Sequence, residues 1–359
     1  MEHYNIVIIG LGPAGSILAS GLKNTYSILA IDKKNPTVFD GGFSKACGGL
    51  LAPDAQKALA ELALVVPKSV IVDPQIFSVK TIDFDNHLTK YYQRMYININ
   101  RHAFDLWLMK SIPDHVNKAF DCTVIKVNIN ADGKYTIDYR NKQNIVVTCS
   151  ADIVIGADGA SSIVRRYLYP KATYRYYTAI QQWFINPDKK PIYSCIFDSK
   201  ITDCYSWTVS KDDYLLFGGA YPSKLSRMLF ERQKEKLLST NTFALSKPVK
   251  TEACLVMRPK LLKHFFLGKN NAFLVGEAAG FVSPSSLEGI SYAINSAVAL
   301  TNVLNAQHLD FNKKYRQLTK KMRWTLYLKN IKSMFIYNPF LRKLIMKSGI
   351  QSIKVKDVS

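Results

Sequence analysis

Three glycines near the start of the chain have the spacing of a phosphate-binding turn. They follow a β-branched apolar run at positions 4–9 and precede a run of small residues at 16–22. Glycines in this arrangement permit a tight turn, let the backbone approach a pyrophosphate and let a helix pack closely on a strand. We therefore expect a strand, a turn and a helix whose first N–H groups bind phosphate. The predicted phosphate-binding residues are Gly10, Gly12, Pro13, Ala14 and Gly15.

An acidic residue follows the next predicted strand. The run 27–31 ends at Asp32, which lies 22 positions after Gly10, and Lys33 comes next. A carboxylate at this distance accepts hydrogen bonds from a ribose diol, so we place Asp32 and Lys33 in the cofactor site. The strand, turn, helix and acid together argue against a glycine-rich turn without function. They do not distinguish NAD from FAD.

The composition limits the classes of protein that fit. The 359 residues are 48% hydrophobic and 21% charged, which is typical of a globular protein with a core. The formal net charge of +21 favours contact with an anion, such as cofactor phosphates, a lipid surface or nucleic acid. The six cysteines lack metal-site spacing, so we expect reduced thiols and no metal. Since neither a signal peptide nor a run of about 20 apolar residues is present, we expect a cytoplasmic protein.

Two later segments indicate which of the two cofactors, NAD or FAD, the chain binds. The buried strand predicted at 152–157 leads into Asp158 and Gly159, and the segment resembles the DG motif of the flavoprotein hydroxylase superfamily. Residues 272–281 resemble the GD motif of that superfamily, with Glu277 where Asp is usual. The resemblance implies FAD and a helix N-terminus, at the start of 291–299, that stabilises the reduced ring. The residues that it adds to the cofactor site are Asp158, Gly159, Gly276, Glu277, Gly280, Gly289 and Ile290.

Residues 98–108 support this assignment. They resemble the R-x-x-F-D-x-x-L helix start of the same superfamily, which implies that Arg101 contacts FAD. A guanidinium suits phosphate or ribose oxygens. The alternative is a surface arginine at the start of a helix.

A loop of cysteine and glycine residues indicates one branch of this superfamily. Residues 44–54, SKACGGLLAPD, resemble the loop of the geranylgeranyl reductase branch, and Tyr205 and Trp207 resemble part of its Y-x-W-x-F-P motif, in which Val209 and Ser210 replace Phe and Pro. The chain is thus similar to geranylgeranyl reductase-like FAD-dependent oxidoreductases. Tyr205 and Trp207 would bind substrate, or else pack in the core. The loop residues implied near FAD are Lys45, Ala46, Cys47, Gly48 and Gly49.

The resemblance also implies the fold. We predict an α/β protein, α+β overall, with a Rossmann-like FAD-binding domain of the p-hydroxybenzoate hydroxylase and glutathione reductase type. An antiparallel β-sheet substrate domain is interleaved with it, and helices follow at the C-terminus. The predicted ranges are 1–70, 95–170 and 265–300 for the FAD-binding domain, 71–94 and 171–264 for the substrate domain, and 301–359 for a basic helical segment.

The C-terminal segment is strongly basic. From Lys313 to Lys356 it has thirteen Lys or Arg residues and no Asp or Glu, and Pro339 predicts a break between two helices. Its apolar face either packs on the FAD-binding domain or lies against anionic lipid, where each basic residue contributes about 1 kcal/mol. The second interpretation places the protein peripherally at the inner face of the cytoplasmic membrane. The residues that share this face are Trp324, Tyr327, Leu328, Ile331 and Phe335.

The function that we expect is reduction of carbon–carbon double bonds in a prenyl or polyprenyl lipid by hydride from reduced FAD. Cys47 would donate a proton, or serve only as a packing wall. No second dinucleotide fingerprint is present, so the reductant is either transiently bound NAD(P)H or a ferredoxin-type donor. One alternative is an aromatic monooxygenase, either a hydroxylase or a halogenase. Another is a non-catalytic flavin-binding or RNA-binding protein, although no nucleic-acid module is recognisable.

Overall fold

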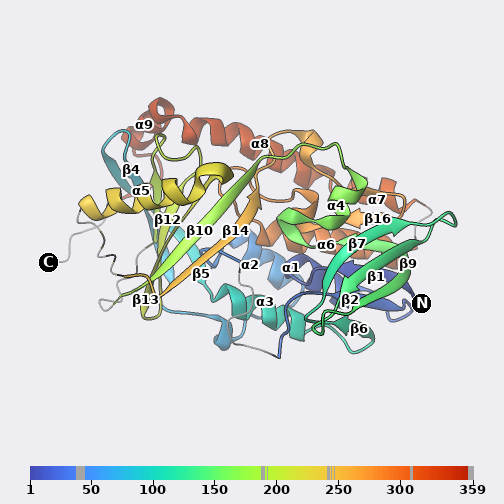
Figure 1. Ribbon diagram of the computed structural model, residues 1–359. Coiled ribbons are helices and arrows are strands. Elements are labelled where there is room, and N and C mark those ends of the chain that lie inside the picture. Colours follow the sequence, from blue (N-terminus) through green and yellow to red (C-terminus); the bar gives the residue numbers. More distant parts are fainter. Residues whose placement is uncertain are drawn as a thin grey trace. The chain divides into compact units, whose positions relative to one another are not determined.

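The structure is a computed structural model that describes residues 1–37, 45–186, 191, 193–240, 243, 245, 247–307 and 310–354 (Figure 1). The chain forms two compact units, each made of three segments. Unit 1 comprises Met1–Phe43, Phe104–Arg175 and Met257–Leu328. Unit 2 comprises Ser44–Ala103, Tyr176–Val256 and Lys329–Ser359.

Unit 1 contains a largely parallel sheet. Its described strands are β1 (Glu2–Ile9), β2 (Ile28–Ile31), β6 (Val116–Ala119), β7 (Thr123–Ile129), β8 (Tyr135–Arg140), β9 (Val146–Gly156), β15 (Gly268–Lys269) and β16 (Ala272–Leu274). The order is β15–β16–β9–β1–β2–β6, and the strands from β16 to β6 run parallel. The hairpin of β7 and β8 pairs with β9. Ile6, Val7 and Ile8 have no exposed surface, as expected for a parallel strand that is covered on both faces.

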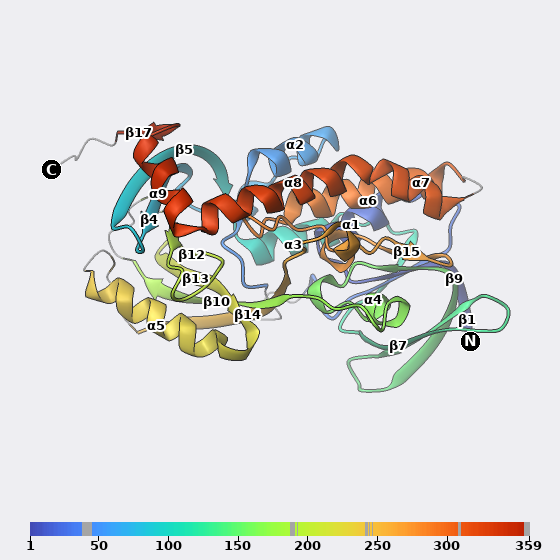
Figure 2. The same ribbon diagram turned by 90° about the horizontal axis from the view of Figure 1, so that it is seen from above.

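Helices cover the unit 1 sheet (Figure 2). They include α1 (Pro13–Gly21), α4 (Ile163–Leu168), α6 (Ile290–Asn305) and α7 (Phe311–Leu318). Pro13 opens α1, where its fixed φ favours a helix and its missing N–H costs nothing. A Cβ on Gly21 would lie 2.9 Å from the Thr301 methyl, so this glycine lets α1 and α6 approach closely. The Tyr315 hydroxyl donates to the Leu274 carbonyl at 2.9 Å and thereby joins α7 to β16.

Unit 2 contains a second sheet, which is mostly antiparallel. Its described strands are β3 (Leu50–Leu51), β4 (Ile76–Asp83), β5 (Leu88–Asn98), β10 (Tyr176–Ile185), β11 (Tyr193–Phe197), β12 (Ser206–Lys211), β13 (Tyr214–Pro222), β14 (Lys250–Met257) and β17 (Ser352–Ile353). Their order is β14–β10–β13–β12–β11–β4–β5–β17, and β3 also pairs with β5. Only the β4–β11 pairing among the described registers of this sheet is parallel.

A helix that the sequence analysis did not foresee packs on the unit 2 sheet. Helix α5 (Ser226–Ser239) lies along β10 and β13 in both views (Figures 1 and 2). Its buried side chains, Leu229, Phe230, Gln233 and Leu237, have helical spacing. The Phe230 ring stacks on Phe217 with centroids 5.1 Å apart. The interleaved segment is therefore a sheet with a helix on one face.

The remaining helices include α2 (Pro53–Glu61) and α9 (Pro339–Ser348) in unit 2. Two others, α3 (Arg101–Lys110) and α8 (Lys320–Tyr337), continue from one unit into the next. Pro339 starts α9, so the predicted break between two C-terminal helices is confirmed. Within the described ranges, no helix has the length and apolar character needed to cross a membrane. The predicted fold class is confirmed by the Rossmann-like parallel sheet, the mostly antiparallel second sheet and the C-terminal helices.

Candidate functional site

The three predicted FAD motifs lie together at one edge of the unit 1 sheet. Strands β1, β9 and β16 are parallel neighbours, so the turns that follow them share the C-terminal edge, where α/β proteins bind ligands. A Cβ built on Gly10 would lie 2.7 Å from the Asp158 Cα, and one on Gly276 would lie 3.0 Å from the Ala14 Cβ. The motifs therefore touch one another, and their glycines allow this proximity.

The N-terminus of α1 has the features of an anion-binding site. Gly12 is the N-cap residue, and no side chain of the described residues caps the helix. A Cβ on Gly12 would find no described heavy atom within 4 Å, so the space beside it is open. Since the first turn carries no acid, its N–H groups and the positive end of the helix dipole suit a phosphate.

Asp32 is buried at the end of β2. Its Oδ2 accepts a hydrogen bond from the Leu11 N–H, and its Oδ1 accepts one from the Lys34 N–H at 2.7 Å. Each carboxylate oxygen has a further lone pair, so a ribose hydroxyl can still bond to Asp32. Lys33 is exposed, whereas the Nζ of Lys34 lies 2.7 Å from the Asp105 Oδ2 in a buried ion pair. This pair, which the sequence analysis missed, joins the end of β2 to α3.

The DG and GD turns contribute two carboxylates. Asp158 Oδ2 accepts from the Ile163 N–H at 2.7 Å, while its buried Oδ1 has no hydrogen-bond partner among the described residues. Burial raises the pKa of Asp158 above its ordinary value. Glu277 Oε1 accepts from the Met257 N–H at 3.0 Å, and its Oε2 faces the DG turn, 3.9 Å from a Cβ built on Gly159. A ligand hydroxyl would satisfy Asp158 Oδ1.

Arg165 connects these two turns. Its fully buried guanidinium donates from Nη1 to the Ala278 carbonyl at 2.7 Å and from Nη2 to the Ala160 carbonyl. Its Cζ also lies 4.7 Å from the centroid of the Tyr174 ring. This role of Arg165 was not predicted from the sequence. The only signal was the position of Arg165 directly after the DG turn.

The last cofactor residues predicted in unit 1 lie before α6 or at its start. Gly276 and Gly280 have φ of 58° and 87°, left-handed conformations that favour glycine. Gly289 is the N-cap residue of α6 and Ile290 is its first residue, and no described side chain caps this helix. A second helix N-terminus is therefore present in the same unit as the three motifs.

The predicted cysteine loop belongs to unit 2. Residues 45–49 lead into β3, and Cys47 is half-buried, with its Sγ 3.4 Å from the Gly49 N. Gly49 has φ of 61°, and a Cβ there would lie 2.5 Å from the Ile99 carbonyl oxygen. The Cys254 thiol donates to the Ala46 carbonyl at 3.6 Å. Arg101 starts α3, also within unit 2.

A buried lysine that the sequence analysis missed holds this loop. Lys211 Nζ donates to Asn98 Oδ1 at 2.6 Å, to the Ile99 carbonyl at 2.7 Å and to the Gly49 carbonyl at 3.1 Å. These three acceptors match the three donors of an ammonium group. Burial nevertheless lowers the pKa of Lys211 to about 7, against the opposing effects of Cys47 and Asp212.

The predicted substrate residues lie next to the same loop. Tyr205 precedes β12 and Trp207 lies within it, with ring centroids 5.7 Å apart. A Cβ on Gly48 would lie 3.7 Å from the Trp207 Nε1, which is buried and has no hydrogen-bond partner among the described residues. Unit 2 thus brings the cysteine loop, Lys211 and this aromatic pair together. The described part of the chain contains no cluster of three or more His, Cys, Asp or Glu residues able to hold a metal ion.

Comparison with known sequences establishes the family. Protein CbrA of Escherichia coli K12 is 50% identical over 361 residues, covering 99% of this chain and 100% of the E. coli protein. The chain belongs to the CbrA family. CbrA of Shigella sonnei is also 50% identical over 361 residues. No family model matches the chain.

Solved structures share the fold of this CbrA-family chain at lower identity. A geranylgeranyl bacteriochlorophyll reductase-like protein of Thermoplasma acidophilum is 19% identical with a TM-score of 0.80, covering 100% of this chain and 94% of that one. PqsL of Pseudomonas aeruginosa, described as a probable FAD-dependent monooxygenase, is 15% identical with a TM-score of 0.70, covering 97% and 100%. The flavin-dependent halogenase CmlS is 17% identical with a TM-score of 0.69, covering 99% and 69%. The predicted geranylgeranyl reductase-like fold is thereby confirmed.

Proposed function

We propose that the chain is an FAD-dependent oxidoreductase that reduces carbon–carbon double bonds of a prenyl or polyprenyl lipid. The observation that carries the proposal is the meeting of the glycine turn, the DG turn and the GD turn at one edge of the unit 1 sheet. The fold shared with two flavin-dependent enzymes and a geranylgeranyl reductase-like protein supports it. Bound FAD would supply hydride chemistry.

Different residues of unit 1 would bind different parts of FAD. The first turn of α1 and the open space at Gly12 fit the diphosphate. Asp32 can accept from a ribose hydroxyl, and Asp158 Oδ1 can accept from a further cofactor hydroxyl. The N-terminus of α6, which no described side chain caps, would stabilise negative charge on the reduced cofactor.

Unit 2 would bind the lipid. The aromatic rings of Tyr205 and Trp207 would offer an apolar contact for a prenyl chain. The Trp207 Nε1, which has no partner among the described residues, would offer one hydrogen-bond donor for a polar end group. Lys211 holds the cysteine loop beside this pair. The Cys47 thiol would donate the proton that completes reduction of a double bond. NAD(P)H or a ferredoxin-type donor would supply the electrons.

Two measurements on the purified protein test the proposal. A flavin absorbance spectrum with release of intact FAD on denaturation would support the cofactor, and release of FMN or of no flavin would overturn it. Mass spectrometry of co-purified lipids should then identify a prenyl compound. Anaerobic incubation of that lipid with chemically reduced protein should add two hydrogens per double bond. An unchanged lipid would contradict the proposed reaction.

The second candidate function is aromatic monooxygenation. The fold likeness to PqsL and to CmlS supports it. Oxygen consumption stimulated by a phenol, without anaerobic reduction of the lipid, would favour monooxygenation over lipid reduction.

A further inference from the structure

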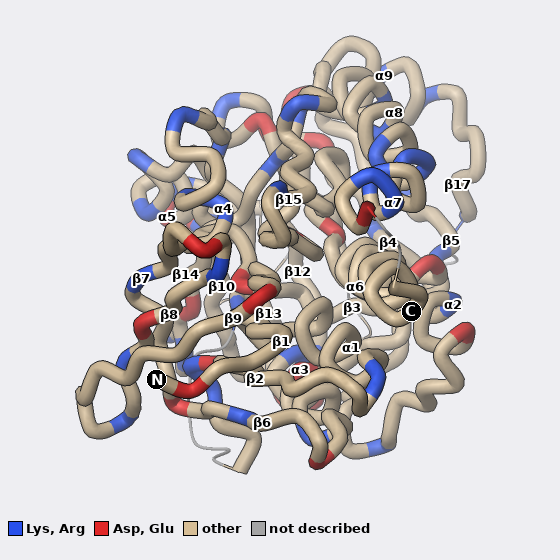
Figure 3. Tube along the Cα trace, turned by 90° about the vertical axis from the view of Figure 1, so that its right-hand side faces the viewer, with Lys and Arg blue, Asp and Glu red and all other residues tan. Residues whose placement is uncertain are grey.

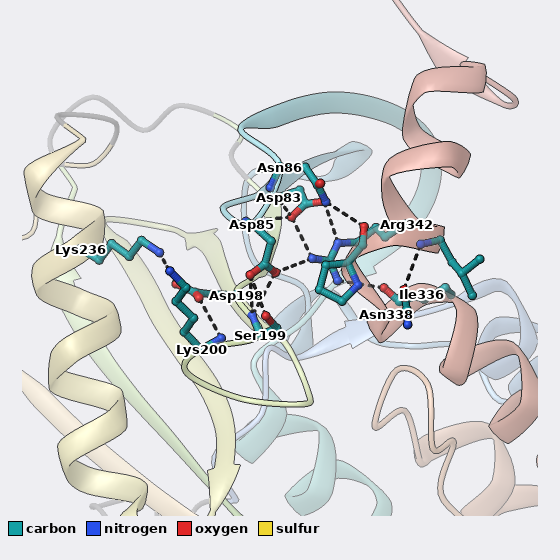
Figure 4. A network of polar contacts seen from close by, with 12 residues as sticks. Asp83, Asp85, Asn86, Asp198, Ser199, Lys200, Lys236, Ile336, Asn338 and Arg342 are labelled. Atoms are coloured by element: carbon teal, nitrogen blue, oxygen red, sulfur yellow. Dashed lines mark hydrogen bonds and ion pairs between the residues drawn. The ribbon is translucent and has the colours of Figure 1, made fainter.

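The last helix of unit 2 is fixed in orientation by a buried arginine (Figure 4). Arg342 donates from Nε and Nη2 to the two oxygens of Asp83, both at 2.8 Å, and from Nη2 to Asp85 Oδ2 at 2.6 Å. The Asn86 side chain donates to the Pro339 carbonyl at 2.8 Å, at the start of the helix. These contacts join α9 to the turn between β4 and β5. They also determine which face of α9 points inward.

The opposite face of α9 is apolar and exposed. Arg342 and Met346 are buried one turn apart, whereas Phe340 and Leu344 are 67% and 52% exposed. Side chains four positions apart share a helix face, so Phe340 and Leu344 form one outward stripe. The end of α8 adds further exposed apolar side chains. We call this set the tail face, and its members are Ile331, Met334, Phe335, Phe340, Leu344, Ile345 and Ile350.

Only positive charges occur in the segment that carries the tail face. Basic residues recur along α8 and α9 (Figure 3), and the sequence has no Asp or Glu from Phe311 to Lys356. The acidic residues Asp83 and Asp85 contact α9, and both are paired with Arg342. Long lysine stems can lie along apolar surface while their ammonium groups reach outward. The exposed lysines of the segment are Lys332, Lys343, Lys347 and Lys354.

We propose that the tail face docks on an anionic lipid surface. Its large apolar side chains would enter the boundary between headgroups and acyl chains, and its lysines would meet lipid phosphates. A second copy of the chain fits less well, because two such faces would bring lysines together without a single acid between them. Nucleic acid would match the charge but would offer no apolar surface for Phe340 and Leu344. The inference is independent of FAD and of the proposed reaction.

Vesicle flotation of the full-length protein tests the proposal. We expect flotation with vesicles of phosphatidylcholine and phosphatidylglycerol, and little with phosphatidylcholine alone. Lys343→Gln with Lys347→Gln should weaken partitioning about 25-fold, from a factor of about five per lysine. Phe340→Ser with Leu344→Ser should weaken it by at least about tenfold. The matched control is Leu225→Ser with Met228→Ser, which removes exposed apolar surface elsewhere in unit 2 and should leave flotation unchanged.

Several outcomes would overturn the proposal. These are no flotation on either vesicle, equal flotation on both, or equal partitioning of the Phe340/Leu344 variant and its control. A dimer seen by analytical ultracentrifugation, lost in that variant while the wild type fails to float, would instead make the tail face a contact between copies. If the Phe340/Leu344 variant unfolds at a lower temperature than the wild type, the Lys343/Lys347 variant still tests the proposal, because its substitutions replace exposed side chains.

Discussion

Arg342 and Asp83 form a two-bond ion pair inside unit 2, although 259 positions separate them in the sequence. The Nε and Nη2 atoms of the arginine each lie 2.8 Å from one oxygen of the carboxylate, and both side chains are buried. The Arg342 Cζ also lies 4.9 Å from the centroid of the Phe197 ring. The pair therefore couples the last helix of the chain to the β4–β5 turn and to β11.

Loss of this pair should destabilise the protein. Arg342→Ala leaves Asp83 and Asp85 buried without their counter-ion, so we expect the free energy of unfolding to fall by about 3–5 kcal/mol. Arg342→Lys keeps the charge but not the paired geometry and should cost less. Urea unfolding followed by tryptophan fluorescence measures both. Lys347→Ala, on the exposed side of α9, is the control, and equal stability of Arg342→Ala and this control would contradict the prediction.

Two glycines of the first turn should respond differently to substitution. Gly12 has φ of −67° and open space at its Cβ, so Gly12→Val should change the stability of the cofactor-free protein by less than about 1 kcal/mol. The added side chain would occupy the space proposed for the diphosphate, and the FAD content should fall at least about tenfold. Absorbance at the flavin bands of the purified variants measures this content. Full FAD content in Gly12→Val would contradict the proposed binding site.

Gly10→Ala is the companion variant. Gly10 has φ of 94°, and its Cβ would lie 2.7 Å from the Asp158 Cα. We therefore expect loss of folding stability, by about 1–3 kcal/mol or more, before any effect on FAD. Thermal melting of the cofactor-free protein distinguishes the two glycines. Equal melting temperatures for Gly10→Ala and the wild type would contradict the steric argument.

Lys211 should make stability depend on pH. Burial lowers the pKa of Lys211 to about 7, whereas an unfolded lysine has a pKa of about 10.4. Between these values the unfolded state binds a proton that the folded state lacks, so the free energy of unfolding rises with pH, by about 2 kcal/mol from pH 7 to pH 9. Above pH 9 the thiols of Cys149 and Cys195, whose pKa values desolvation raises to about 11, act in the opposite direction.

The Lys211→Met variant isolates this effect. It should lose the rise in stability between pH 7 and pH 9, measured by urea unfolding at several pH values. Lys200→Met, at an exposed lysine of the same unit, should retain it. An identical pH dependence in the wild type and Lys211→Met would show that Lys211 is not the titrating group.

Cys47 should affect turnover without affecting the cofactor. If its thiol donates the proton, Cys47→Ala should slow anaerobic lipid reduction about 100-fold or more, with unchanged FAD content. Cys254→Ala, which removes the neighbouring thiol that bonds to Ala46, should retain most of the activity. Full turnover of Cys47→Ala would show that Cys47 only packs beside the site and does not donate the proton.

The sequence predicted best what is encoded locally. Runs such as 4–9 and 152–157 combine β-branched residues with a following glycine turn, and they become the adjacent strands β1 and β9. Parallel strands place the turns at their ends on one edge, so the meeting of the FAD motifs follows from their recognition. Pro339 likewise predicted the helix break, because proline favours the first turn of a helix.

Contacts between distant segments could not be predicted in this way. Periodicity shows that a side chain is buried but not which group it will meet. Lys211 bonds to Gly49 and Asn98, 162 and 113 positions away, and no local pattern connects them. The apolar face of the C-terminal helices posed the same difficulty. Packing on the FAD-binding domain and contact with lipid both require apolar residues along one helix face, so the sequence does not distinguish them. The structure describes Ile331 and Phe335 as exposed, and both belong to the tail face.

The order of strands in the unit 1 sheet determines when β9 can complete its pairing during synthesis of the chain. Strand β16 pairs with β9, yet about 115 residues separate them in the chain. At about 5–20 residues per second, a ribosome needs on the order of ten seconds to complete this interval. During that time residues 154–156 of β9 lack their partner, whereas residues 146–151 can already pair with β8, and an unpaired stretch of strand edge can pair with other chains. We therefore expect newly made chains to depend on chaperones until β16 has emerged.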